Sequence, residues 1–332
     1  MFMAGPTASP SMHATARAHP IQGLVKYHGL RDPDRRYPYH DSISVATAPA
    51  ETVTTVDFDP DVDESRFVVD GERVTGEGAA RIRRVLDRVR ELADDPALEG
   101  PVLLESENSM PTNVGLGSSS SGFAAAAMAA VAAAGLDLTR PEISTIARRG
   151  SASAARSVTG GFSDLRAGTT DADCRSHRIE SPLADELKIV AGIVPAYKET
   201  GWAHEEATES HLWQSRLAHV HDQLAAMRQA LREGDFQTAF GVAERDTLSL
   251  AATTMTGPEA WIYWKPRTLE IFEAVRELRD AGLPVYFSTD TGATVYVNTT
   301  EPHVDRVEET IADLGVETRV WEVGGPATVL EN

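Results

Sequence analysis

The sequence predicts an α+β protein made of two strand-and-helix halves, residues 14–185 and 186–330. Three observations lead to this prediction. Short strand-like segments gather between Ala14 and Asp70, helical patterns dominate the second half, and an alanine-rich run from Gly122 to Leu136 is typical of a buried helix. With 332 residues, of which 42% are hydrophobic, the chain can bury one large core or two coupled ones.

The first half begins with strands. Pro- and Asp-rich turns separate strand-like segments at 42–48, 51–58 and 66–70, and we expect these segments to form an antiparallel sheet. After the Asp70-Gly71 turn, apolar residues recur at helical spacing and predict an amphipathic helix. These residues are Ile82, Val85, Leu86, Val89 and Leu92. A strand at 101–108 leads into a Gly/Ser segment and the alanine-rich helix. A further helix begins at 141–149, and we expect it to continue through 150–157.

The second half is mostly helical. It opens with a strand at 187–194, and helices are expected within 204–233, 235–250 and 259–281. Short strands at 284–287 and 294–297 flank the turn Ser288-Thr289-Asp290-Thr291-Gly292. A helix at 304–314 and a strand at 316–321 complete the predicted elements.

The charge of the chain is strongly acidic. Thirty-one basic residues against 50 acidic ones give a net charge of −19, which excludes nucleic acid and an anionic membrane as the main partner. Only four basic residues are lysine: Lys26, Lys188, Lys198 and Lys265. Acid-rich, lysine-poor surfaces suit molar salt, where screening removes self-repulsion. We therefore expect a cytoplasmic protein of a halophile.

No membrane, secretion or disulfide signal is apparent. The run from Gly122 to Leu136 is shorter than the roughly 20 residues that a bilayer requires. Residues 1–13 contain two prolines and no apolar stretch of the kind that signal peptides carry. Cys174 is the single cysteine, so it has no internal disulfide partner, and the sequence has no zinc pattern.

The segment PTNVGLGSSSSG at 111–122, between a predicted strand and the alanine-rich helix, is typical of a phosphate-binding loop. Glycines let backbone N–H groups approach an anion, the positive end of a helix favours phosphate, and serine hydroxyls add hydrogen bonds. A flexible connector with a capping serine is the alternative. The segment lacks GxxxxGK[ST], which excludes a P-loop NTPase.

Two further motifs join this loop: GLVKYHGLRD at 23–32 and RRGSASAARSVTGG at 148–161. Together with STDTG at 288–292, they make the chain resemble the mevalonate diphosphate decarboxylase branch of the GHMP kinase superfamily. The resemblance extends from about Ala18 to the last helix. The serine loop is common to all GHMP kinases, whereas KYxG, SxSAxRSxxGG and a late Asp-x-Gly in this order are specific to the decarboxylases.

The resemblance implies a GHMP kinase fold, with an N-terminal half like ribosomal protein S5 domain 2 and a C-terminal ferredoxin-like half. It implies ATP on the serine loop with Mg²⁺, a homodimer, and an active site between the halves. Members of this branch phosphorylate the tertiary 3-hydroxyl of a mevalonate derivative. Loss of that phosphate then drives the departure of CO₂ and leaves an isopentenyl product.

The resemblance assigns catalysis to two residues. Asp290 matches the aspartate that orients the 3-hydroxyl and accepts its proton, and Lys26 matches the lysine beside it. From the residues alone, Asp290 is a turn residue, since Asp-x-Gly between strands usually forms a turn. An aspartic protease would need a second Asp-Thr-Gly, which this chain lacks. A solvated lysine is the alternative for Lys26, although a lysine retained in so lysine-poor a chain favours a function.

The remaining site residues are also assigned by the resemblance. Arg156 matches the arginine that binds the substrate's carboxylate, because its planar fork fits a planar acceptor. The residues expected near the substrate's phosphate and carboxylate are Tyr27, Ser151 and Ser153; helix capping is the alternative for the serines. The residues expected at the nucleotide are Ser106, Asn108, Ser118, Ser119 and Ser120, with Ser119 placed nearest the γ-phosphate or Mg²⁺.

Two departures from the family pattern bear on the substrate. The family usually reads KYWGK, and this chain places Leu30 where the second lysine reaches a diphosphate. An arginine that holds the diphosphate has only Arg81 as a loose match. The resemblance therefore favours the archaeal relatives that decarboxylate 5-phosphomevalonate and make isopentenyl phosphate. A diphosphomevalonate decarboxylase, a mevalonate kinase-type enzyme without decarboxylation and a non-catalytic binding protein are the alternatives.

Overall fold

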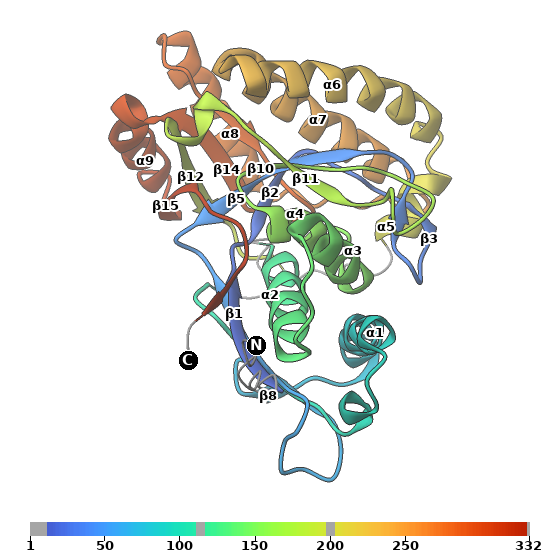
Figure 1. Ribbon diagram of the computed structural model, residues 1–332. Helices are drawn as coiled ribbons and strands as arrows, with labels where there is room; N and C mark the ends of the chain where they lie inside the picture. Colours follow the sequence, from blue (N-terminus) through green and yellow to red (C-terminus); the bar gives the residue numbers. More distant parts are fainter. Residues whose placement is uncertain (1–11, 111–116, 197–202, 331–332) are drawn as a thin grey trace, which may run out of the picture.

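Two large β-sheets organise the protein, whose computed structural model describes residues 12–110, 117–196 and 203–330 (Figure 1). The first sheet has six strands among these residues. In spatial order they are β16 (Thr328–Leu330), β1 (His13–Ala18), β6 (Thr52–Asp57), β9 (Leu103–Asn108), β7 (Arg66–Val69) and β8 (Glu72–Arg73). The predicted α+β class is confirmed.

The second sheet combines strands from both halves of the chain. Its order is β11 (Ser176–Ile179), β10 (Phe162–Leu165), β5 (Ser42–Ala48), β15 (Glu317–Val323), β12 (Leu187–Ile193), β14 (Val295–Thr300) and β13 (Tyr286–Ser288), and β2 (Ile21–Val25) pairs with β5. A two-stranded hairpin of β3 (Leu30–Asp32) and β4 (Tyr37–Pro38) stands apart from both sheets. The sheet therefore joins the two predicted halves through β5.

The prediction of one antiparallel sheet between Ala14 and Asp70 is wrong in two respects. The segment β5 lies in the second sheet, because it pairs with β2, β10 and β15. The segment β7 runs parallel to β9, since the chain crosses over between them through helix α1 (Gly76–Ala93). Strand propensity alone does not specify the partner of a strand.

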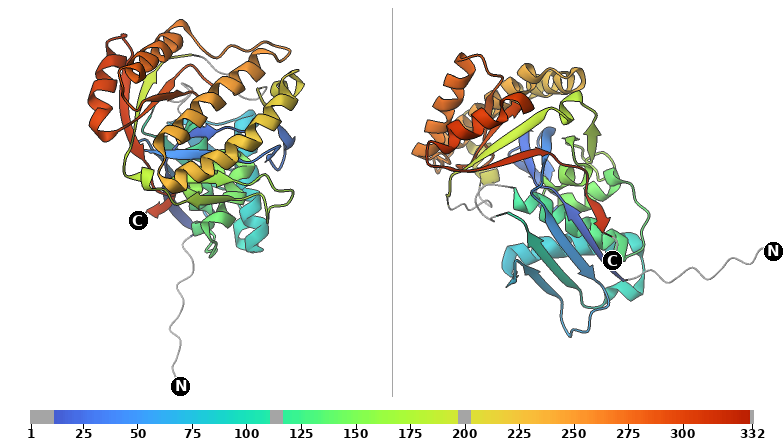
Figure 2. Two further views of the ribbon diagram at one scale, coloured as in Figure 1. Left: turned by 90° about the horizontal axis from the view of Figure 1, so that it is seen from above. Right: turned by 90° about the vertical axis from the view of Figure 1, so that its left-hand side faces the viewer.

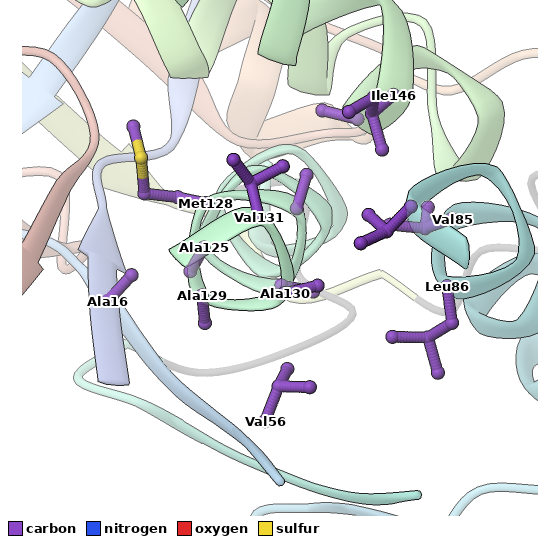
Figure 3. Close-up of a cluster of buried hydrophobic side chains, with 14 of the residues drawn as sticks. Ala16, Val56, Val85, Leu86, Ala125, Met128, Ala129, Ala130, Val131 and Ile146 are labelled. Atoms are coloured by element: carbon purple, nitrogen blue, oxygen red, sulfur yellow. The ribbon is translucent and has the colours of Figure 1, made fainter. Parts of the chain in front are cut away.

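The alanine-rich helix α2 (Ser118–Ala133) is the centre of the first core, as predicted. Figure 3 shows its alanines facing β1, β6 and the side chains of α1 and α3 (Arg140–Gly150). Alanine carries no side chain beyond Cβ, so neighbouring elements can approach this helix on every side. The helix is thereby fixed, and its first turn is held beside β2.

Helices cover both faces of β12 in the second sheet. Ile189 and Ala191 point into a cluster with α6 (Trp213–Glu233) and α7 (Phe236–Met255). Val190 points into a cluster with α8 (Pro266–Asp280) and α9 (Val304–Ala312) on the opposite face. Figure 2 shows these helices enclosing the C-terminal strands. A short helix, α5 (Ala203–Glu209), precedes α6.

The expected continuation of the 141–149 helix is wrong. Helix α3 ends at Gly150, and the next residues turn into a separate short helix, α4 (Ala154–Thr159). A Cβ on Gly150 would come within 2.2 Å of the Phe123 ring, so the helix end is packed too tightly for any other residue. The helix expected within 259–281 is α8, which begins at Pro266, a residue that suits the first turn of a helix.

The predicted boundary near 185 lies between β11 and β12. The last strand, β16, nevertheless returns to the first sheet and pairs with β1, with Thr15 opposite Leu330. The division into residues 14–185 and 186–330 stays a prediction. Within the described residues, no helix is long and apolar enough to cross a membrane.

The net charge of −19 predicts that the folded state needs salt. At ~0.1 M salt the Debye length is near 10 Å, so neighbouring carboxylates repel each other across the surface. We expect the thermal unfolding midpoint and the activity to rise steeply as KCl increases toward molar concentration. Scanning calorimetry across a KCl series checks this, and full stability at ~0.1 M would contradict the halophile interpretation.

Candidate active site

Lys26 directly follows β2 and is 6% exposed. Its Nζ donates to the hydroxyl of Thr247 at 3.0 Å and to that of Ser288 at 3.2 Å. Its Nζ also lies 3.7 Å from Oδ2 of Asp246. The structure thus places the lysine predicted from the KYxG motif in a buried polar site between β2, α7 and β13.

A buried ion-pair network holds Lys26, and sequence reasoning missed it. Asp246 on α7 accepts from the backbone N–H of Lys26 at 3.0 Å through Oδ2 and from Nη2 of Arg216 on α6 at 2.9 Å through Oδ1. Nη2 of Arg216 also donates to the Lys26 carbonyl at 2.9 Å. All three side chains are almost fully buried. Asp246 therefore fixes both the backbone and the charge of Lys26.

A usable signal for this network was present in the sequence. Asp246 follows Val242 and Ala243 at spacings of four and three, which places a carboxylate on the buried face of a helix. A charged residue on an apolar helix face needs a buried partner. The spacing could have identified Asp246, whereas its partners come from β2 and α6 and required the fold.

Burial lowers the pKa of Lys26, and the carboxylates of Asp246 and Asp290 oppose that effect. The two cations Lys26 and Arg216 thus face two carboxylates, Asp246 and Asp290. Both carboxylates favour the charged form of the buried ammonium. The charge is then available to offset negative charge that develops on a bound substrate.

Asp290, in the STDTG turn after β13, lies beside the same strand. Its Oδ1 accepts from the backbone N–H of Gly23 on β2 at 3.0 Å. A Cβ on Gly23 would stand 2.8 Å from Cγ of Lys26 and 2.9 Å from Oδ1 of Asp290. Position 23 therefore has to be glycine, and its missing side chain lets the predicted lysine and aspartate come together.

The serine segment reaches the same strand. Ser120 accepts from the backbone N–H of Ile21 on β2 at 3.2 Å and donates to the Gly117 carbonyl at 2.6 Å. Residues 21 and 23 are about 7 Å apart along a strand. The start of α2 and the carboxylate of Asp290 are thus neighbours on β2, although Ser120 and Asp290 are 170 positions apart in the sequence.

The three predicted phosphate serines have different surroundings. Ser120 is buried and links α2 to β2, whereas Ser118 is half-buried and Ser119 is exposed at the first turn of α2. Gly117 has φ +74°, and a Cβ there would stand 3.1 Å from the Ile21 carbonyl. The first turn of a 16-residue helix leaves backbone N–H groups that suit phosphate. The loop residues 111–116 lie outside the described residues.

Ser106 and Asn108 are bonded within the first sheet. The Ser106 hydroxyl lies 2.7 Å from that of Thr54 on β6. The Asn108 amide donates to Asp70 at 3.0 Å and accepts from Thr52 at 2.7 Å. Both side chains thus hold the strand ends that lead to the serine segment. Their predicted contact with the nucleotide stays a prediction.

Arg156 on α4 is 3% exposed. Its Nε and Nη1 are buried and have no hydrogen-bond partner among the described residues. Its guanidinium carbon lies 5.5 Å from the centre of the Tyr27 ring, and burial lowers its pKa, whereas Tyr27 and Asp290 raise it. Buried donors without acceptors are costly in a ligand-free protein. The arrangement therefore favours an anion beside Tyr27.

Ser151 and Ser153 lie at the break between α3 and α4. Their hydroxyls are 2.8 Å apart, and neither caps a helix through its side chain. The capping alternative is therefore not what the structure has. The break turns both serines toward the start of α4, the helix that carries Arg156.

Arginines gather around Tyr27. Nε of Arg81 on α1 donates to the Gly150 carbonyl at 2.6 Å, directly before Ser151, and its guanidinium lies 4.7 Å from the Phe123 ring centre. Burial and the nearby Arg36 lower the pKa of Arg81 to about 10. Arg81, a loose match in the sequence, thus lies near the predicted phosphate end of the substrate.

Leu30, where the family carries a second lysine, lies half-buried in the β3–β4 hairpin. The neighbouring Arg31 donates to the carbonyls of Pro38 at 2.9 Å and Gly168 at 2.5 Å. Since its guanidinium is bonded to backbone groups, Arg31 is poorly placed to supply the missing charge. The described residues also contain no cluster of three or more His, Cys, Asp or Glu that could hold a metal.

The site can orient a hydroxyl and transfer a phosphoryl group to it. A carboxylate that could accept a proton, an ammonium and an exposed helix start lie along one strand, β2. Next to them is a buried arginine with unused donors. Together they provide a base, a cation and donors for anions, which are the groups that phosphoryl transfer to a hydroxyl requires.

Comparison with known proteins supports this geometry. Residues 18–176 match the family described as the diphosphomevalonate decarboxylase-like N-terminal domain. The chain is 66% identical to the phosphomevalonate decarboxylase of Haloferax volcanii over 321 residues, which cover 96% of this chain and 98% of that protein.

Solved structures agree with the sequence comparison. The mevalonate diphosphate decarboxylase of Staphylococcus aureus aligns with a TM-score of 0.89 at 27% identity, over 96% of this chain and 98% of that one. A structure described as MDDEF in complex with MVAPP, AMPPCP and magnesium gives a TM-score of 0.89 at 28% identity, over 96% and 99%. The predicted GHMP kinase fold is confirmed.

Proposed function

The chain belongs to the diphosphomevalonate decarboxylase family of the GHMP kinases, and we propose that it decarboxylates (R)-5-phosphomevalonate with ATP. The products are isopentenyl phosphate, ADP, phosphate and CO₂. The observation that supports this most is the position of Asp290. Its carboxylate lies on β2 between the start of α2 and Lys26, where a hydroxyl can meet a phosphoryl donor.

The first step is transfer of the γ-phosphoryl group of ATP to the 3-hydroxyl. Asp290 orients the hydroxyl and accepts its proton as the new O–P bond forms. Lys26, held by Asp246, offsets the negative charge that grows on the oxygen. The Gly23 N–H fixes Asp290, so the base is positioned before the substrate arrives.

The second step is elimination. The bond from C3 to the new phosphate breaks, and the electrons of the bond between the carboxylate carbon and C2 form the C2–C3 double bond, which releases CO₂. Arg156 holds the carboxylate by its two buried donors, with Ser151 and Ser153 beside it. A fixed carboxylate stays aligned with the leaving phosphate.

Nucleotide phosphates are proposed to bind at the first turn of α2. Ser118 and Ser119 face away from the core there, and Ser119 is the serine nearest to open solvent. Mg²⁺ would enter with ATP, since the described residues provide no carboxylate cluster for a resident ion. Solved relatives with an ATP analogue and magnesium support ATP and Mg²⁺ as the co-substrate.

Arg156→Lys is expected to be a damaging substitution. Lysine keeps the charge but has neither the planar fork nor the buried Nε donor. We expect kcat/KM for the mevalonate substrate to fall ~10- to 100-fold, in the range for one charge-assisted hydrogen bond, with KM for ATP unchanged. Steady-state kinetics of both substrates checks this. Arg88→Lys on α1 is the control, and equal effects of the two would make Arg156 structural.

The monophosphate is proposed as the substrate on two grounds. Leu30 removes the cation that the family pattern places near a second phosphate, and Arg31 is bonded elsewhere. The relative of 66% identity is also named a phosphomevalonate decarboxylase. An extra phosphate in a partly desolvated site without a matching cation loses hydration that nothing replaces.

The reaction type is tested by counting products. Purified protein in molar KCl is given MgATP with mevalonate, 5-phosphomevalonate or 5-diphosphomevalonate, and ADP and CO₂ are measured together. A decarboxylase releases one CO₂ per ADP. ADP without CO₂ would instead identify a kinase, and no turnover with any substrate would identify a binding protein. Light scattering in the same buffer tests the expected homodimer.

A further inference from the structure

A group of arginines lies at the end of the site that the phosphate of the substrate would occupy. In a chain of net charge −19, Tyr27 interacts electrostatically with Arg36, Arg81 and Arg156, and Arg84 interacts with Arg36 and Arg81. Glu77 is the carboxylate that also acts on Arg36 and Arg81. Asp290 and Asp164 act on Arg156. A group of arginines at one end of a site, in a protein this acidic, indicates a bound anion.

These arginines are not equivalent, because their guanidinium groups have different partners. Arg84 lies 3.2 Å from Glu77, and Arg81 donates to the Gly150 carbonyl. Arg156 lies against Tyr27, at the start of the proposed carboxylate site. Arg36 is half-buried, and its Nε is buried without a hydrogen-bond partner among the described residues. Arg36 is therefore the member of the group with an unused buried donor and no assigned role.

The fold holds Arg36 in this place. It lies in the β3–β4 hairpin with φ +55°, a conformation that costs energy for a residue with a side chain. Buried Arg148 donates to the carbonyl of Arg35, directly before it, and lies 4.5 Å over the ring of Tyr37, directly after it. The hairpin is thereby clamped on both sides of Arg36.

The hairpin also packs against the proposed substrate site. Tyr37 belongs to a buried cluster with Ala152 and Ala155, and Tyr27 packs on the same cluster. Ala152 lies between the two predicted serines, and Ala155 precedes Arg156. Arg36 thus belongs to a hairpin that packs against α4, the helix that carries Arg156. Burial and, to a smaller extent, Arg84 lower the pKa of Arg36, whereas Tyr27 and Glu77 oppose that effect.

We propose that Arg36 binds the 5-phosphate of the substrate, while the second cation that the family pattern places at position 30 stays absent. The inference rests on the proposed function. Leu30 and Arg36 belong to the same short hairpin, so Arg36 serves one phosphate while Leu30 leaves a second phosphate without a cation. A guanidinium suits a terminal phosphate because its planar donors can bind two oxygens at once.

The test compares Arg36→Leu with Arg35→Leu. Arg35 is the exposed neighbour, and its replacement removes the same charge while keeping the carbonyl that Arg148 binds. We expect Arg36→Leu to raise KM for 5-phosphomevalonate about 10- to 100-fold, the range for one hydrogen bond to a charged group. Because Arg36 touches no reacting atom, kcat should stay within about threefold, and KM for ATP should not change. Arg35→Leu should match the parent.

Relocation of the charge provides a second test. Leu30→Lys combined with Arg36→Leu restores a cation to the hairpin. We expect the double variant to have a KM for 5-phosphomevalonate at least about tenfold lower than that of Arg36→Leu alone. Arg36→Gln, which keeps the length and removes the charge, replaces Arg36→Leu if that variant unfolds; thermal unfolding shows this.

Three outcomes would overturn the inference: KM for the substrate within twofold of the parent in Arg36→Leu, an equal change in Arg35→Leu, or a rise in KM for ATP instead. The last outcome would place the nucleotide at Arg36. Failure of the proposed function can be distinguished from failure of the inference about Arg36. If the parent turns over only the diphosphate, the same variants measured with that substrate still test Arg36.

Discussion

Asp290→Asn should abolish nearly all CO₂ release while leaving ATP binding within a few-fold of the parent. The amide can still accept the Gly23 N–H through its oxygen, so the turn keeps its position. It cannot take the proton from the 3-hydroxyl, and a general base contributes ~10²–10⁴ in rate. Single-turnover CO₂ release and equilibrium ATP binding, both in molar KCl, measure the two quantities separately.

Asp280→Asn is the matched control for this substitution. Asp280 is an exposed carboxylate at the end of α8, in the same half of the chain. Its loss changes the net charge equally, and we expect unaltered kinetics. Asp290→Asn with more than a tenth of the parent rate would remove Asp290 as the base and leave it the turn residue that sequence reasoning also allowed.

Asp246→Asn should destabilise the protein more than any other single carboxylate substitution in the site. The change leaves Arg216 and Lys26 buried without their shared counter-charge. Breaking a buried ion pair on one side costs about 3–5 kcal/mol in the free energy of unfolding. Chemical denaturation of the parent and the variant in the same salt gives this difference.

The pH dependence of that difference identifies its origin. Burial raises the pKa of Asp246, but Arg216 and Lys26 outweigh it, so the pKa lies below its ordinary value. A carboxylate with a depressed folded-state pKa stabilises the fold above its unfolded-state pKa, near 3.9, and loses that contribution as the pH falls through the folded-state pKa. The difference in the free energy of unfolding between the parent and Asp246→Asn should therefore be largest at neutral pH and decrease in acid.

Exposed Asp222→Asn on α6 serves as the control and should change stability little at any pH. A gap between parent and Asp246→Asn that is independent of pH would mean that packing, and not charge, is what Asp246 contributes. The double variant Asp246→Asn with Arg216→Met should lose less stability than the two single changes added together, since it removes both ends of the pair.

Local patterns predicted most of the elements. Ser42–Ala48 and the alanine-rich helix were identified because one shows strand propensity between turns and the other is apolar on every side. Small departures have local causes. Leu92, placed on the apolar stripe, is 38% exposed because it lies in the last turn of α1, beyond the core. Strand partners, by contrast, depend on crossovers that no local window contains.

The residues of the site also differ in whether local sequence motifs could predict them. Lys26, Asp290 and Arg156 were predicted from motifs that resemble a family, and their roles stay predictions. Asp246, Arg216 and Arg36 were missed, since each gains its meaning from residues on other elements. For Arg36 the sequence holds no signal beyond a run of arginines in a turn, and its unused buried donor becomes visible only after the hairpin packs on α4.

The central claim is that the protein is a decarboxylase for the monophosphate. Its most direct test is the ratio of kcat/KM for 5-phosphomevalonate to that for 5-diphosphomevalonate, measured as ATP-dependent CO₂ release in molar KCl. We expect a ratio well above one, and a Leu30→Lys variant whose ratio shifts toward the diphosphate by ~1–3 kcal/mol. A parent enzyme that prefers the diphosphate would contradict it.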